Sequence, residues 1–343
     1  MIDNRWDPCA RGSREPVENA LASNPRRMET PAMNRKFRRL FPFLLLPALL
    51  TGCLEFEHQT MSYHYDKSTD TLRIFQDYHG IFGEDAKGKT GEGPSADEQE
   101  QLESVLKGQR TFFFSNWIFE YNRAQLEQQL QELKIPEKRA ELNLSEAGLA
   151  SLEKLLKLLL ENVRVENGPF YLDAGKKLCG VQYVTVTRCP ALIAAVNESA
   201  PYFVKSQTEH ENLSEQDKAA ALRFAGHPHP VVQLDGNALT VRWPASRESY
   251  DRDFGPSAQD ATKVAEARKA GLNFSFEDDA VICKLGKSSD SITGLKLSFS
   301  TNTYVPNLVG PAGKQHVIRD AFDAKTAADD FLLGNRKASA AQK

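Results

Sequence analysis

From residue 54 onward, two consecutive segments alternate apolar and polar side chains with the period of a β-strand. They are Leu54–Tyr65 and Thr71–Tyr78, and the polar run DKSTD between them has the composition of a turn. Successive side chains of a strand point to opposite faces, so this alternation is typical of a strand with one buried face. The pattern therefore predicts a β-hairpin.

Longer segments repeat their apolar residues with the period of an α-helix. The predicted helices are Arg123–Leu133, ended by Pro136; a leucine-rich helix capped by Ser145; Pro190–Gln207, broken near Pro201; Ser214–Phe224; and Ala258–Ala270. Short apolar runs rich in β-branched and aromatic residues predict further strands. These are Asn162–Val165, Phe170–Leu172, Leu178–Thr187, a hairpin over 231–243, Leu272–Phe276, Ala280–Leu285 and Leu295–Phe299.

Turn residues decide how these segments connect. Asn167-Gly168 and the run AGKK are typical of hairpin turns. Residues Ser246–Pro256 are predicted to be irregular, and His316–Phe322 to form a short helix. Together the pattern predicts an α+β fold, in which antiparallel β-hairpins and a sheet pack with several amphipathic helices.

The stretch Asn34–Cys53, NRKFRRLFPFLLLPALLTGC, has a different pattern. Basic residues precede an apolar run of about 11 residues that contains two prolines, whereas a spanning helix needs about 20 apolar residues. The run ends in Leu50-Thr51-Gly52-Cys53. The arrangement resembles the export signal of bacterial lipoproteins, whose lipobox has Leu three positions before an invariant Cys. The resemblance implies cleavage between Gly52 and Cys53 and a diacylglycerol on the sulfur of Cys53.

This signal divides the chain into four parts. Residues 1–32 have no hydrophobic period, and we expect them to be disordered or a start-site artefact, with translation beginning at Met33. Residues 33–52 are the expected signal peptide, and residues 53–324 a single α+β envelope domain. The tail, 325–343, is rich in Ala, Asp and Lys, and we expect its end to be disordered.

Two details of the signal bear on the export route and the destination. Arg38-Arg39-Leu40-Phe41 resembles the twin-arginine pattern of proteins exported already folded, whereas the leucine-rich core is typical of the ordinary secretory route. Leu54, and not Asp, follows the cysteine, which resembles lipoproteins sent to the outer membrane where an organism has two membranes. We expect a lipid-anchored protein of the cell envelope that faces the periplasm or the cell surface.

The charge balance excludes some partners. The whole chain has 43 Lys and Arg against 46 Asp and Glu, and residues 1–52 hold nine basic and five acidic residues of these. The remaining 34 basic and 41 acidic residues give the mature chain a net charge of −7. Nucleic-acid binding needs a concentrated basic surface, so it is not expected. Acylated Cys53 is the expected link to the membrane.

Three further cysteines remain in the mature chain: Cys179, Cys189 and Cys283. Ten residues of one strand at about 3.3 Å each separate Cys179 from Cys189, far beyond the Cα distance of about 7 Å that a disulfide allows. An exported protein meets oxidising conditions, so a disulfide would involve Cys283. Three small buried thiols are the alternative.

Few residues form a pattern that indicates chemistry. Asp77 and His79 lie two residues apart at the end of a predicted strand, a spacing that suits an acid–base pair, but no nucleophile is identifiable beside them. His227 and His229 of HPHP would present two imidazoles to a metal, but a catalytic zinc needs three protein ligands. No cofactor is predicted.

Three other clusters are weak candidates for binding. The densest aromatic segment places Phe113, Trp117 and Tyr121 on one face, which suits either a binding surface or the core. Asp251–Gly255 and Glu277–Asp279 are acidic, but neither has the ligand spacing of a calcium loop.

The sequence thus favours a lipid-anchored envelope module without enzymatic activity that binds a protein, a lipid or a glycan. The alternative is an envelope hydrolase or metal-dependent enzyme that uses Asp77, His79 or the HPHP segment.

Overall fold

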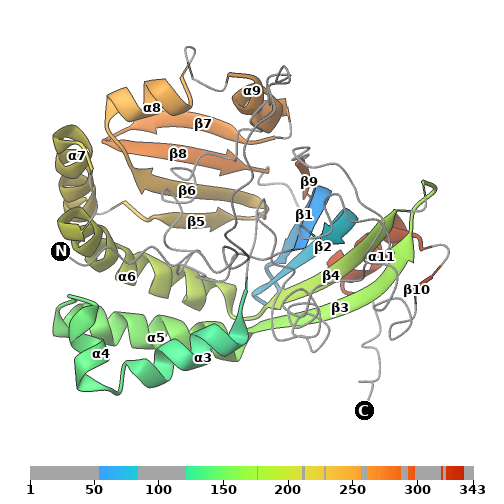
Figure 1. The fold of residues 1–343 in the computed structure, drawn as a ribbon, viewed down its shortest axis with the longest axis horizontal. Helices are drawn as coiled ribbons and strands as arrows, with labels where there is room; N and C mark the ends of the chain where they lie inside the picture. Colours follow the sequence, from blue (N-terminus) through green and yellow to red (C-terminus); the bar gives the residue numbers. More distant parts are fainter. Residues whose placement is uncertain are drawn as a thin grey trace, which may run out of the picture.

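The computed structural model describes two β-sheets with helices packed around them (Figure 1). The residues that it describes are 54–83, 121–175, 177–210, 213–227, 229–255, 258, 261–269, 271–286, 293–297, 318–319 and 322–335. Both sheets consist mainly of antiparallel hairpins, and helices cover their faces. The predicted α+β fold is confirmed.

The first sheet has six strands in the order β10-β3-β4-β2-β1-β9. Their bounds are Leu54–Asp66 (β1), Thr71–Gly83 (β2), Val163–Leu172 (β3), Leu178–Val186 (β4), Thr293–Leu297 (β9) and Ile318–Arg319 (β10). All neighbours pair antiparallel except β10 and β3, which run parallel. The predicted first hairpin is β1–β2, and Asp66 closes its turn by accepting hydrogen bonds from Ser68 and Thr69.

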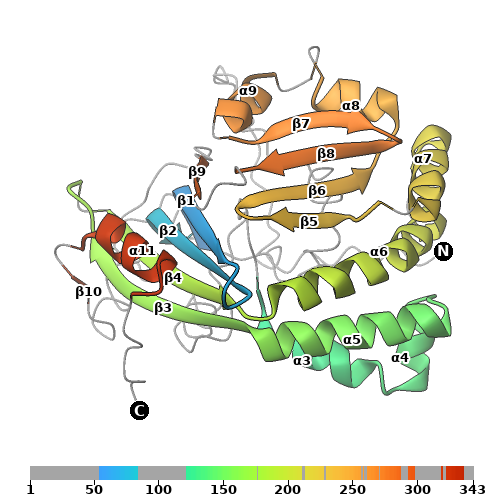
Figure 2. The same ribbon diagram turned by 180° about the vertical axis from the view of Figure 1, so that it is seen from behind.

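Each face of this sheet is buried by a different set of helices. At the end that holds the β1–β2 turn, aromatic and β-branched side chains of one face pack against leucines of α3 (Arg123–Glu132) and α5 (Glu146–Asn162). The opposite face packs against α11 (Ala324–Leu332), which Figure 2 shows lying across the sheet. Because strand side chains alternate between faces, burial on both sides explains the nearly continuous burial of β4.

The second sheet has four strands in the order β5-β6-β8-β7. Their bounds are Val232–Asp235 (β5), Ala238–Pro244 (β6), Asn273–Glu277 (β7) and Ala280–Leu285 (β8). One face holds a core that includes Trp243 and Phe254, and the other packs against α6 (Cys189–His210) and α7 (Glu215–Gly226). Asn237, in the β5–β6 turn, joins the sheets: its side chain accepts from the backbone N–H of Tyr65, and its carbonyl accepts from the Tyr63 hydroxyl.

The helix α3 ends before Pro136, as predicted, and Pro136 occupies the first turn of a further short helix, α4 (Pro136–Glu141), where its missing N–H costs nothing. The predicted break near Pro201 was wrong, because α6 runs through this residue. An interior proline loses one helical hydrogen bond, but α6 packs against α5, α7 and β5, and this tertiary packing outweighs the local preference.

Asn167-Gly168 is not a hairpin turn, because β3 continues through it with a register shift between Asn167 and Phe170. A Cβ on Gly168 would lie 2.3 Å from Val181 Cγ2, so glycine allows the close approach of β4 at this bulge. The AGKK turn between β3 and β4 was predicted correctly.

Two further segments differ from prediction. Ser246–Pro256 was predicted to be irregular but contains a helix, α8 (Arg247–Asp253), capped by Ser246. The helix after it, α9 (Ala261–Lys269), was predicted. Within the predicted short helix His316–Phe322, the two residues Ile318 and Arg319 form a strand. The helix α11 begins at Ala324, the last residue of the expected domain, and continues into the tail, of which only the end was expected to be disordered.

Candidate functional site

The two side chains of the candidate acid–base pair are in contact. Asp77 and His79 lie on the same face of β2, and the imidazole Nε2 of His79 is 2.9 Å from Asp77 Oδ2. The antiparallel register places Cys179 of β4 directly opposite His79, and Tyr171 of β3 directly opposite Cys179. The pairing of three strands thus brings together four polar side chains that are far apart in the sequence. We refer to Asp77, His79, Tyr171 and Cys179 as the His79 cluster.

Both ring nitrogens of His79 have partners. Nε2 faces the carboxylate of Asp77, and Nδ1 lies 3.6 Å from Cys179 Sγ. The carboxylate also accepts a hydrogen bond of 2.8 Å from the Tyr171 hydroxyl. On β1, the ring of His58 stacks on His79 with their centroids 4.3 Å apart. These contacts fix the orientation of the imidazole between a carboxylate and a sulfur atom.

Burial by itself lowers the pKa of His79, because a charged ring loses hydration. Hydrogen bonds to Asp77 and Cys179 and the negative charge of Asp77 outweigh this effect and raise the pKa to about 10. His79 is therefore an imidazolium at neutral pH and donates from both nitrogens. Burial and the charge of Asp77 also raise the pKa of Tyr171, which stays a neutral donor.

The cluster lies under the C-terminal part of the chain. Cys179 is fully buried in a core with Phe331 and Leu332 of α11, and the ring of Phe322 packs against Tyr171 with centroids 5.3 Å apart. The side chain of His79 retains 23% of its exposure and that of Asp77 9%. A solute therefore reaches the cluster at its imidazole and not at its sulfur.

An imidazole held by a carboxylate and directed at a thiol is the arrangement that activates cysteine nucleophiles. Sequence reasoning found Asp77 and His79 but assigned Cys179 to a strand without a role. The signal that would identify Cys179 is the register between β2 and β4, because only that pairing places His79 opposite Cys179. No local pattern contains this information.

The HPHP segment brings its two histidines together but adds no third ligand. The rings of His227 and His229 stack with centroids 5.5 Å apart, and His229 Nε2 lies 3.6 Å from Asp278 Oδ2. Both members of that ion pair are about half exposed. Within the described residues, no group of three or more His, Cys, Asp or Glu side chains is arranged to hold a metal ion.

The remaining weak candidates do not form sites within the described residues. Tyr121 is buried in the core that packs on α5, while Phe113 and Trp117 lie outside the described residues. Asp251 and Asp253 belong to α8 and form ion pairs with arginines of the same helix. The three cysteines of the fold are free and buried.

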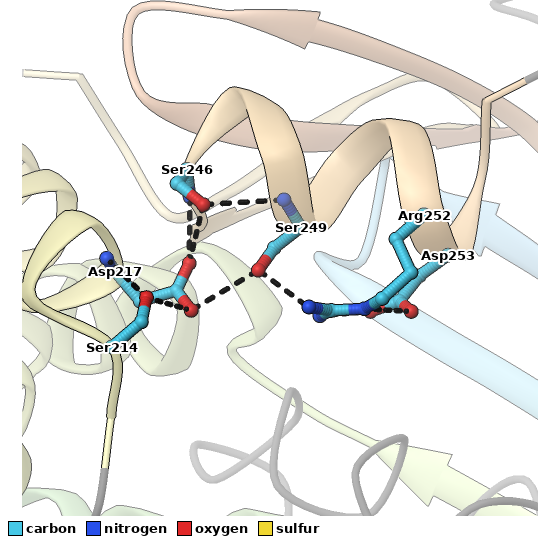
Figure 3. Close-up of polar contacts among 6 residues, drawn as sticks. All are labelled: Ser214, Asp217, Ser246, Ser249, Arg252 and Asp253. Carbon is cyan, nitrogen blue, oxygen red and sulfur yellow. Dashed lines mark hydrogen bonds and ion pairs between the residues drawn. The ribbon is translucent and has the colours of Figure 1, made fainter.

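Sequence reasoning also missed a polar network between α7 and α8 (Figure 3). Asp217 of α7 accepts hydrogen bonds from the N–H and the hydroxyl of Ser246, at 3.1 and 2.6 Å, and from Ser249 at 3.1 Å. Ser214 donates to the same carboxylate, and Arg252 donates to Ser249. Burial raises the pKa of Asp217, but the hydrogen bonds from Ser246 and Ser214 outweigh it and lower that pKa. The network docks the first turn of α8 on α7, so its role is structural.

Cys53 lies outside the described residues, and the first described strand begins at the next residue, Leu54. None of the helices in the described ranges is both long and apolar enough to cross a bilayer. Neither a protein-family profile, nor a curated protein, nor a solved structure matches this chain.

Proposed function

We propose that this protein is a lipid-anchored module of the cell envelope, attached through acylated Cys53, which binds a protein, a lipid or a glycan close to the membrane surface. The observation that carries the proposal is the lipobox Leu50-Thr51-Gly52-Cys53 followed at once by a folded strand. In an organism with two membranes, Leu54 after the cysteine favours the outer membrane.

The position of β1 supports a module held against the bilayer. β1 begins at Leu54, so no spacer separates the acylated residue from the sheet. His58 pairs with His79 across the β1–β2 hairpin, four residues along the strand from Leu54. At about 3.3 Å per residue this is roughly 13 Å, so the His79 cluster would lie near the membrane end of the domain.

The anchor is tested by growing cells with an alkyne analogue of palmitate and detecting the labelled protein. We expect label on the wild type and none on Cys53→Ala, which should also keep residues 33–52, because cleavage of this signal class follows lipid attachment. Cys283→Ala is the matched control and should be labelled like the wild type. Equal labelling of Cys53→Ala, or an unlabelled wild type, would refute the anchor.

Binding near the membrane is tested by cross-linking in intact envelopes. We expect the anchored protein to be cross-linked to a discrete partner, and the same chain exported with an ordinary cleavable signal to lose most of that product. An unchanged product after loss of the anchor would show that attachment to the membrane does not serve binding.

The second candidate is an envelope hydrolase, favoured by the hydrogen-bonded pair of Asp77 and His79 and by the sulfur of Cys179 beside it. Metal analysis of the mature chain separates a metal-dependent reaction at His227 and His229 from a metal-free reaction at the His79 cluster. Stoichiometric zinc that is lost on changing His227 and His229 would support a metal-dependent reaction. A metal-free protein whose hydrolytic activity disappears with His79→Gln would support one that uses the His79 cluster.

A further inference from the structure

The three buried cysteines of the fold have different surroundings. Burial and the nearby charge of Asp70 raise the pKa of Cys189 to about 12, and burial alone raises that of Cys283 to about 12. Both are therefore protonated and inert at neutral pH. Cys179 is equally buried, but its sulfur has the Nδ1 of His79 at 3.6 Å. Among the described cysteines, Cys179 alone has a histidine ring against it.

The contacts of His79 place its positively charged ring beside the sulfur of Cys179. Asp77 binds Nε2, so the imidazolium turns its other N–H toward Cys179. An adjacent imidazolium stabilises a thiolate, which is the nucleophilic form of cysteine. As a thiol, Cys179 has an acceptor for its proton in the backbone carbonyl of Lys177, at 3.5 Å. The sulfur therefore has a partner in either form.

The core that buries Cys179 includes side chains of α11. This helix packs on the face that carries Cys179 through Phe331 and Leu332, with Ala327 and Ala328 beside them. It contributes no strand to either sheet, so the strands remain paired when it leaves. Proteins open locally in units that cost less free energy than global unfolding. Because α11 is paired to no strand and packs mainly through two large side chains, it is able to open while the sheets persist.

We propose that Cys179 is a site of thiol–disulfide exchange with low-molecular-weight disulfides, activated by His79 and covered by α11. The thiolate of Cys179 attacks one sulfur of the disulfide R–S–S–R. A bond forms between Cys179 and that sulfur, the S–S bond breaks, and R–S⁻ leaves with the electron pair. The leaving thiolate takes the proton from His79 Nδ1, so one RSH is released and Cys179 is oxidised to a mixed disulfide. The proposal concerns the fold and does not depend on lipid attachment.

The test measures how fast each cysteine reacts in one protein. The mature chain from residue 53, carrying Cys53→Ala, is mixed with oxidised glutathione under native conditions, and the mixed disulfides are located by peptide mass spectrometry. We expect Cys179 to react at least tenfold faster than Cys189 or Cys283, which serve as internal controls for global unfolding. Equal rates at all three cysteines, or no reaction at Cys179 before unfolding in urea, would overturn the proposal.

Two variants separate activation from access. His79→Gln should slow Cys179 at least tenfold in the folded protein but leave its rate in urea unchanged. Leu332→Ala should loosen α11 and speed Cys179 at least tenfold without changing Cys283, and Phe331→Leu is the milder substitute if that variant does not fold. If Leu332→Ala or Phe331→Leu accelerated Cys179 and Cys283 equally, α11 would not act as a separate cover of Cys179. An unchanged rate in His79→Gln would show that the imidazole does not activate the thiol.

Discussion

Replacing Asp77 with Asn tests the charge assigned to the His79 cluster. The substitution keeps the size of the side chain but removes the carboxylate that accepts from His79 at 2.9 Å and from Tyr171 at 2.8 Å. Breaking a buried ion pair costs about 3–5 kcal/mol when the remaining charge stays buried. Here His79 is partly exposed and is able to release its proton, so we expect a loss of about 2 kcal/mol in the free energy of unfolding at pH 6.5.

The effect should depend on pH in a defined direction. The pKa of His79 is about 10 in the folded protein and 6.5 ordinarily, so the folded state holds this proton more tightly than the unfolded chain does. The stabilisation is therefore complete below about pH 6.5 and is lost as the pH rises through 10. We expect the difference between wild type and Asp77→Asn to fall to less than half by pH 9.5.

The assay is urea unfolding of both proteins, followed by circular dichroism at pH 6.5, 8 and 9.5. Asp66→Asn is the matched control, because the pKa of Asp66 is lowered to about 2 by hydrogen bonds from Ser68 and Thr69, and its carboxylate stays charged over this range. Its effect should not change with pH. A difference for Asp77→Asn that stays constant from pH 6.5 to 9.5 would refute a charged His79.

Three further substitutions test the packing by chemical denaturation. Asp217→Ala should cost about 2 kcal/mol, because the first turn of α8 loses its hydrogen bonds to α7, and a loss below about 0.5 kcal/mol would contradict this assignment. Gln59→Met should change stability by less than about 1 kcal/mol. It removes the hydrogen bond from Gln59 Nε2 to Gln76 Oε1, which still accepts from Tyr78, but it also removes a buried Oε1 that has no hydrogen-bond partner among the described residues; a loss above about 2 kcal/mol would contradict this. Leu156→Ala should cost about 2–5 kcal/mol because it empties a fully buried position, and a loss below 1 kcal/mol would place Leu156 outside the core.

Local patterns predicted most of the elements correctly. The β1–β2 hairpin follows from alternation, and the Ser145 cap of α5 follows from a serine before a leucine stripe. In each case the residues that decide the structure are close together in the sequence. The α8 helix was missed although Ser246 followed by Glu248 is a helix-start signal, because the charged residues after it show no apolar period.

Elements that depend on distant partners were not predictable. Asn167-Gly168 has the composition of a turn, yet Val181 of β4 lies against Gly168 and the strand continues through a bulge. Pro201 has the composition of a break, yet the neighbours of α6 keep it helical. In both cases tertiary contacts outweigh the local preference.

Two of the four residues of the His79 cluster could be predicted from local spacing, and the other two depend on strand pairing. Asp77 and His79 are neighbours on one strand, so their spacing is visible in the sequence, and the structure confirms that they pair. Cys179 lies 100 residues away from His79, and Tyr171 lies 94 residues away from Asp77. Their place in the cluster follows only from the order β3-β4-β2 in the sheet.

The mass of the first tryptic peptide from purified membranes shows whether the mature protein begins with an acylated Cys53. We expect the peptide Cys53–Lys67 carrying a diacylglycerol on its cysteine, with no peptide from residues 33–52. An unmodified peptide that runs from Leu40 through Cys53 to Lys67 in the mature protein would contradict it.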